Sequence, residues 1–112
     1  MDVRPHLPLA PRDLLVMAAL IEGPLHGYGI IKSVETQSDA GVLLDPANLY
    51  RVLARMRDAG WIEETAPPAE GDERRRTYAL SRLGRDVVRA ELERLKQLVA
   101  YALPSLAEGD VS

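Results

Sequence analysis

The fold is decided by residues 45–80, which read DPANLYRVLARMRDAGWIEETAPPAEGDERRRTYAL. Asp45 is a good helix N-cap, and Pro46 suits the first helical position, where its missing N–H group costs nothing. Apolar residues then recur at the spacing of one buried helix face, and Gly60 stands where a left-handed C-terminal cap belongs. The pattern predicts a helix over residues 46–59.

Two short strands are predicted after this helix. The first covers Trp61–Thr65 and the second Arg74–Leu80, in which Tyr78 and Leu80 fall on the same face. The connecting residues, 66–73, include two prolines and a glycine and are expected to form the tip of a hairpin. A polar-faced helix followed by a basic ribbon is the arrangement of a winged helix-turn-helix, which places the helix in a DNA groove and the ribbon on neighbouring phosphates.

The remaining segments complete a mainly α-helical fold of the α+β class. Further helices are predicted over residues 11–22, 27–37 and 82 to about 103. Residues 42–44 could add a very short strand beside the wing. The buried face of the first helix is expected to consist of Leu14, Met17, Ala18 and Ile21.

The chain divides into one globular unit and its extensions. Residues 11–81 are expected to form the winged-helix domain, and residues 82–106 a C-terminal dimerisation helix. Residues 1–10 are rich in proline and are expected to be a mobile arm, and residues 107–112 a disordered tail.

The last predicted helix carries a heptad-like apolar seam. Its members follow one another at intervals of 4, 3, 4, 3 and 4 residues, the spacing of the core positions of a coiled coil. They are Val88, Leu92, Leu95, Val99, Ala102 and Leu106. Pro104 is expected to bend or end the helix. Because about twenty helical residues extend about 30 Å, more than a small domain covers, the seam predicts a homodimer.

Composition excludes several classes of protein. There is no cysteine, which excludes disulfides and thiolate metal sites and fits a cytoplasmic protein. No segment approaches the ~20 apolar residues that cross a bilayer. The formal net charge of −3 is unusual for a nucleic-acid-binding protein, but binding depends on where the charges lie.

The arginines gather on two elements that could share one surface. Base contacts are expected from the front half of the helix and phosphate contacts mainly from the wing. The candidate DNA-contacting residues are Asn48, Tyr50, Arg51 and Arg55 on the helix, and Arg74, Arg75, Arg76 and Thr77 on the wing.

An enzymatic role has little support in the sequence. His26 and Tyr28 have no partner at metal-ligand or catalytic spacing and are interpreted as helix-end packing. No catalytic residue, metal ligand or cofactor is predicted. Because the chain is acidic, a winged-helix module that binds protein instead of DNA is the alternative hypothesis.

Four segments, in order, resemble the PadR family of bacterial transcriptional regulators. They are Leu25–Ile30, Asn48–Leu53, Asp58–Ile62 and Arg76–Ser81, the last followed by Gly84 and Arg85. The resemblance implies a dimeric winged-helix repressor, joined through the C-terminal helix and relieved by a small-molecule or stress signal. The short C-terminus is similar to that of the compact branch of the family, in which one C-terminal helix suffices.

Some compact members stack flat drugs between tryptophans at the dimer interface. The present chain has one tryptophan, Trp61, at the start of the wing, and its last helix carries only Tyr101 as an aromatic residue. The drug-stacking pocket is therefore not expected here. A two-fold dimer predicts an inverted-repeat operator, with half-sites about 34 Å or a multiple of it apart.

Overall fold

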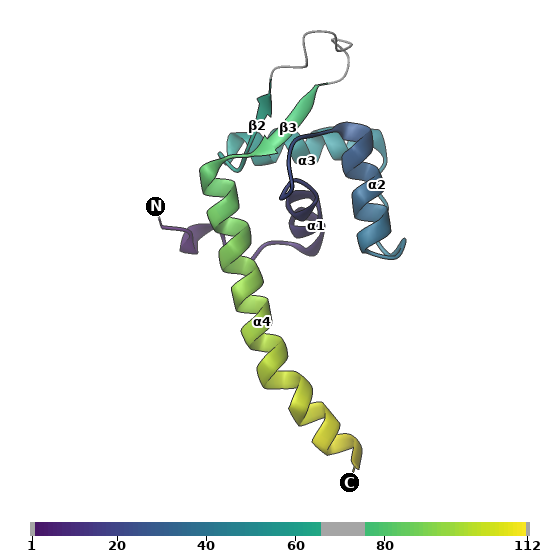
Figure 1. The fold of residues 1–112 in the computed structure, drawn as a ribbon, viewed down its shortest axis with the longest axis vertical. Coiled ribbons are helices and arrows are strands. Elements are labelled where there is room, and N and C mark those ends of the chain that lie inside the picture. The colour runs from purple at the N-terminus through teal and green to yellow at the C-terminus, as the bar shows by residue number, and fades with distance from the viewer. Residues whose placement is uncertain (1, 66–75, 112) are drawn as a thin grey trace.

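The computed structural model describes residues 2–65 and 76–111, and the side chains of these residues up to Glu108. In chain order the elements are η1 (Arg4–His6), α1 (Pro11–Ala19), β1 (Leu25–His26), α2 (Gly27–Gln37), α3 (Pro46–Asp58), β2 (Ile62–Thr65), β3 (Thr77–Leu80) and α4 (Arg82–Val111). Helices α1 to α3 and the sheet form one domain, from which α4 extends far beyond the other helices (Figure 1).

The sheet has three antiparallel strands in the order β1-β3-β2. Leu25 lies opposite Tyr78 on one side of β3, and Glu64 lies opposite Tyr78 on the other. The third strand is therefore β1, and the prediction of a strand at residues 42–44 was wrong. That segment is held at the end of α2 instead, because the Val42 N–H donates a hydrogen bond to the Ser38 hydroxyl at 3.0 Å.

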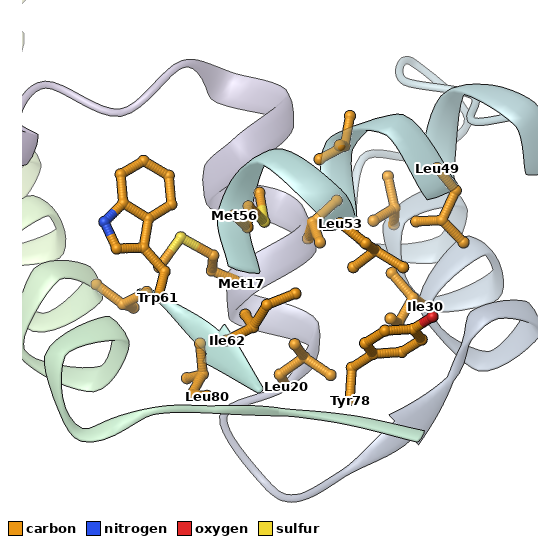
Figure 2. Close-up of a cluster of buried hydrophobic side chains, with 14 of the residues drawn as sticks. Met17, Leu20, Ile30, Leu49, Leu53, Met56, Trp61, Ile62, Tyr78 and Leu80 are labelled. Atoms are coloured by element: carbon orange, nitrogen blue, oxygen red, sulfur yellow. The ribbon is translucent and has the colours of Figure 1, made fainter. Parts of the chain in front are cut away.

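One aliphatic core joins the helices to the sheet. Figure 2 shows side chains from α1, α2 and α3 converging on Ile62, Tyr78 and Leu80 of the sheet, with Trp61 at one end of the cluster. The predicted buried face of α3 is confirmed: Leu49, Val52, Leu53 and Met56 are all buried.

The buried face of α1 differs from the prediction. Val16, Met17 and Leu20 are buried, whereas Ile21 is 38% exposed. The reason is that α1 ends at Ala19, so that Ile21 leaves the helical phase on which the prediction depended.

The segment before α1 packs against the domain, which corrects the expectation of a mobile arm. Leu9 is buried, and its backbone N–H donates to the carboxylate of Glu91 on α4 at 2.6 Å. The indole N–H of Trp61 donates to His6 Nδ1 at 3.0 Å. Glu91 is 1% exposed, and its bond with Arg94 lowers the pKa of the carboxyl despite burial.

Helix α4 begins at a serine cap and runs further than predicted. Ser81 Oγ accepts the Gly84 N–H at 3.0 Å, as an N-cap should. The helix continues through Pro104 to Val111, so residues 107–111 are helical where a disordered tail was expected. Proline removes one helical hydrogen bond, but Ala100, whose carbonyl is freed, and Pro104 itself are exposed, and water can satisfy the group.

No helix within residues 2–65 and 76–111 is long and apolar enough to cross a membrane.

The first turn of α4 lies directly against the backbone of Trp61. A Cβ atom built on Gly84 would stand 1.9 Å from the Trp61 carbonyl oxygen and 2.8 Å from the carbonyl carbon. The Ser81 N–H donates to the same carbonyl at 2.9 Å. Only glycine allows this approach, which sets the angle at which α4 leaves the domain.

We expect Gly84→Ala to destabilise the protein by about 1–3 kcal/mol, because the new methyl group must displace backbone and not a flexible side chain. Chemical denaturation measures the change in the free energy of unfolding. The control is Gly29→Ala in α2, where a Cβ would meet its nearest neighbour at 3.5 Å. This variant should be neutral or more stable, by about 0.5–1 kcal/mol. Equal stability of the two variants would contradict the role given to Gly84.

Candidate nucleic-acid interface

The cap of α3 also orients the first polar side chain on its outer face. Asp45 Oδ1 accepts the backbone N–H of Asn48 at 2.8 Å, which closes the first turn. Asp45 Oδ2 accepts the Asn48 side-chain amide, also at 2.8 Å. Asn48 is thereby fixed at the front of α3, the part of a recognition helix that contacts base edges.

Arg51 projects from the same face one turn further along. It is exposed and forms no ion pair with any described residue. Ala47 and Ala54, four residues before it and three after it, are its small neighbours on the helix surface. The structure therefore presents Arg51 to solvent as the sequence predicted.

Arg55 has a partner inside the domain. Its Nη2 and Nη1 atoms donate to the two carboxylate oxygens of Asp13 on α1, at 2.6 and 3.0 Å. The Asp13 side chain is only 7% exposed. The hydrogen bonds between Arg55 and Asp13 raise the pKa of the Arg55 guanidinium group. The expectation that Arg55 is free to contact DNA is thus corrected, since this edge of α3 faces α1.

The other edge of α3 faces the wing. Two of the predicted DNA-contacting residues lie close together there. Tyr50 and Arg76 line one hollow of about 190 Å³ between α3 and the sheet. Tyr50 is 55% exposed, and its hydroxyl lies beside the first turn of α2, 3.5 Å from where a Cβ of Gly27 would be. Figure 1 shows α3 running beneath the β2–β3 hairpin, and the residues that line the hollow come from both sides.

The wing residues that the structure describes differ in their contacts. Arg76 is exposed and its Nη1 lies 3.7 Å from Glu64 Oε1. The hydroxyl of Thr77 is hydrogen-bonded to that of Thr65 across the hairpin, so it stabilises the strand pair. Arg74 and Arg75 lie outside the described residues.

Two side chains near this surface, Arg57 and Tyr28, were missed or misread in the sequence, whereas His26 lies at a helix end as predicted. Arg57 lies in the same hollow as Tyr50, seven residues later on α3, and its Nη1 donates to Glu64 Oε1 at 2.8 Å. Tyr28 is 65% exposed, and the ammonium of Lys32 lies 5.6 Å from its ring centre. His26 caps α2, because its Nδ1 accepts the Gly29 N–H at 3.0 Å, which agrees with helix-end packing. The seven-residue interval from Tyr50 was the signal for Arg57.

Acidic and histidine side chains do not gather into a metal-binding group anywhere in residues 2–65 and 76–108. The phenol of Tyr78 is also in its neutral form, because burial raises its pKa and the nearby carboxylate of Glu64 raises it further. The chemistry of this surface is therefore that of exposed guanidinium groups, amides and hydroxyls, which suits phosphate and base-edge recognition.

The model of the transcriptional regulator PadR-like family matches residues 16–90. The chain belongs to this family. This family comprises transcriptional regulators, and the chain shares the winged-helix fold of its structural neighbours.

One curated relative is similar to most of this chain. The PadR-like chain is 33% identical over 100 residues to an uncharacterized 37.1 kDa protein in transposon TN4556 of Streptomyces fradiae. The match covers 89% of the present chain but only 27% of that relative.

Solved structures share the fold over most of its length. A transcriptional regulator from Clostridium thermocellum is 26% identical, with a TM-score of 0.65, over 84% of this chain and 87% of its own. The complex structure of hsRosR-S1 is 26% identical, with a TM-score of 0.68, over 99% and 96%. Bacillus subtilis PadR in complex with operator DNA is 19% identical, with a TM-score of 0.62, over 71% and 45%.

We expect Arg55→Ala to lower the free energy of unfolding by about 1–3 kcal/mol, because it leaves the buried Asp13 carboxylate without its partner. Half of the Arg55 side chain faces solvent, which screens the pair and favours the lower end of this range. Chemical denaturation measures the loss. Arg51→Ala is the control and should change stability by less than about 0.5 kcal/mol. A stable Arg55→Ala variant with weakened DNA binding would reverse our assignment.

Proposed function

We propose that this PadR-like protein is a homodimeric repressor that binds an inverted-repeat operator. Each subunit would place the front of α3 in a major groove and its wing on the flanking backbone. The observation that carries this proposal is the exposed face of α3, where Asn48 is held by its cap and Arg51 is unpaired among the described residues. B. subtilis PadR, which has the same fold, was solved in complex with operator DNA.

The dimer would form through α4. The helix has 30 residues, about 45 Å in length, whereas its own domain covers only the first turns (Figure 1). Of the predicted seam, Val88 is buried in the domain, while Leu92, Val99 and Leu106 are 43%, 55% and 65% exposed. Contiguous exposed apolar side chains of this kind mark an interaction surface, and a second copy offers the same seam.

An effector would act through the base of α4. A hollow of about 250 Å³ lies where the turn after α1, β3 and α4 meet. It is lined by Ile21, Leu80, Val88 and Leu92, by Arg85 and Arg89, and by Glu93. Its mixture of apolar walls and guanidinium groups suits a small aromatic acid. The DNA binding of Bordetella bronchiseptica BpsR, a structural neighbour, is regulated by 6-hydroxynicotinic acid. A ligand here would change the angle between α4 and the wing, and so the spacing of the two wings.

We expect the purified protein to bind a duplex from its own promoter with a salt-sensitive affinity. The slope of log K against log salt should be several units negative, because each neutralised phosphate contributes about −0.9. Arg51→Ala should cost about 1–3 kcal/mol on the operator and relax the sequence preference, while unrelated duplexes change less. Fluorescence anisotropy over a salt series measures both effects, with Arg12→Ala on α1 as the control. A slope near zero would disprove the proposal.

We expect the wild type to sediment as a dimer and Val99→Glu to sediment as a monomer. The introduced carboxylate would lie in the apolar seam, where burial without a partner is unfavourable. Gln97→Glu adds the same charge on an exposed position outside the seam and should remain dimeric. Analytical ultracentrifugation distinguishes the two masses. A dimeric Val99→Glu variant would exclude the seam as the interface.

A further inference from the structure

The hollow between α3 and the wing contains two arginines that share one carboxylate. Arg57 Nη1 lies 2.8 Å from Glu64 Oε1, and Arg76 Nη1 lies 3.7 Å from the same oxygen. Arg57 comes from α3 and Glu64 from β2, and Arg76 immediately precedes β3. Two cations and one anion leave the group with one net positive charge, in a hollow large enough for several waters.

The strand register explains why these side chains meet. Glu64 lies opposite Tyr78, and side chains of directly opposed residues share a face of the sheet. Arg76 precedes Tyr78 by two residues and is therefore on that face as well, diagonal to Glu64. This face continues the core, since Tyr78 and Leu80 on it are buried. The triad thus stands where the sheet extends past the core and overhangs α3.

The two arginine side chains are more exposed than that of Glu64, so the site is open to solvent on the arginine side. The Arg57 and Arg76 side chains are 50% and 69% exposed, whereas that of Glu64 is 32% exposed. The guanidinium groups can therefore reach an outside anion without unfolding any element. A phosphate offers oxygens that match the planar guanidinium fork in the same way as a carboxylate.

We propose that Arg57 and Arg76 form a binding site for one backbone phosphate of DNA, and that Glu64 occupies their guanidinium groups until DNA displaces it. The inference rests on the proposed DNA-binding function and adds a residue on α3, Arg57, together with an internal competitor. Glu64 keeps both arginines in position when no DNA is bound and lowers the affinity for every sequence equally. It therefore weakens binding to random DNA, which is recognised by phosphate contacts alone.

The test compares variants on an operator duplex and an unrelated duplex of equal length, by fluorescence anisotropy over a salt series. Glu64→Gln should tighten binding to both duplexes by a similar factor of about five, the effect of one exposed ion pair. It should also steepen the slope of log K against log salt by about one. Arg57→Gln should weaken both and make the slope shallower by about one, whereas Arg57→Lys should keep the slope.

The matched control is Glu63→Gln. Glu63 is the neighbouring residue on β2, is exposed, and lies opposite Ala79 on the outer face of the hairpin. It removes the same charge at nearly the same distance from DNA, so its effect measures the general repulsion of DNA by a carboxylate. In an Arg57→Gln background, the gain from Glu64→Gln should be smaller than in the wild type, because one of the two released cations is absent.

Each outcome decides between explanations. Equal effects of Glu64→Gln and Glu63→Gln, or an unchanged salt slope in Arg57→Gln, would overturn the phosphate site while salt-sensitive wild-type binding left the proposed function intact. Absence of DNA binding by the wild type would end both. Inorganic phosphate at constant ionic strength is the second arm: competition with DNA that requires Arg57 supports the phosphate site, whereas phosphate binding that requires Arg57 without displacing DNA would assign the hollow to a free anion instead. Coincident thermal unfolding curves confirm that the variants are folded.

Discussion

The approach of Gly84 to the Trp61 carbonyl is the contact on which the geometry of this protein depends. It joins the first turn of α4 to the residue that starts the wing, so the long helix and the DNA-facing ribbon share one fixed point. A helix is stiff, and a small angular error at its base grows along a length of about 45 Å. The direction in which the apolar seam faces is therefore determined at the junction, four residues before the seam begins at Val88.

A second contact, seven residues along α4, holds the helix against its own domain. Glu91 is almost completely buried and accepts a backbone hydrogen bond from Leu9. A buried carboxylate is tolerated only when hydrogen bonds and a cation satisfy it, and Arg94 supplies the cation. Two fixed points on one rigid helix define both its tilt and its rotation. The N-terminal segment is thus part of the joint between the domain and the helix.

Sequence reasoning succeeded where the determinants are local. The bounds of α2 followed from its apolar face and those of α3 from its cap, its proline and the 3.6-residue period, and Asp45 caps α3 as expected. It failed where partners are distant in the chain. The strand β1 has only two residues, too few for an alternation, and exists because β3 pairs with it. The packing of Leu9 on Glu91 joins residues 82 positions apart, which no local pattern reveals.

The same distinction between local determinants and distant partners explains how far the sequence predicted the candidate site. Asn48, Tyr50, Arg51 and Arg76 are exposed or half-exposed near the surface where the sequence placed them. Arg55 and Arg57 are both polar residues at the margin of the buried face, and nothing in their local sequence separates them. What separates them is the neighbour across each edge of α3: Asp13 of α1 on one side and Glu64 of the wing on the other.

Trp61 also reports on the position of the N-terminal segment, beyond its packing in the core. It is the only tryptophan in the chain, and its indole N–H is bound to His6 with the two rings edge to face, 5.8 Å between centres. Indole emission responds to the polarity and hydrogen bonding around the ring. The protein consequently contains its own optical probe: without any label, the fluorescence spectrum reads out whether the first residues of the chain are docked or have come away.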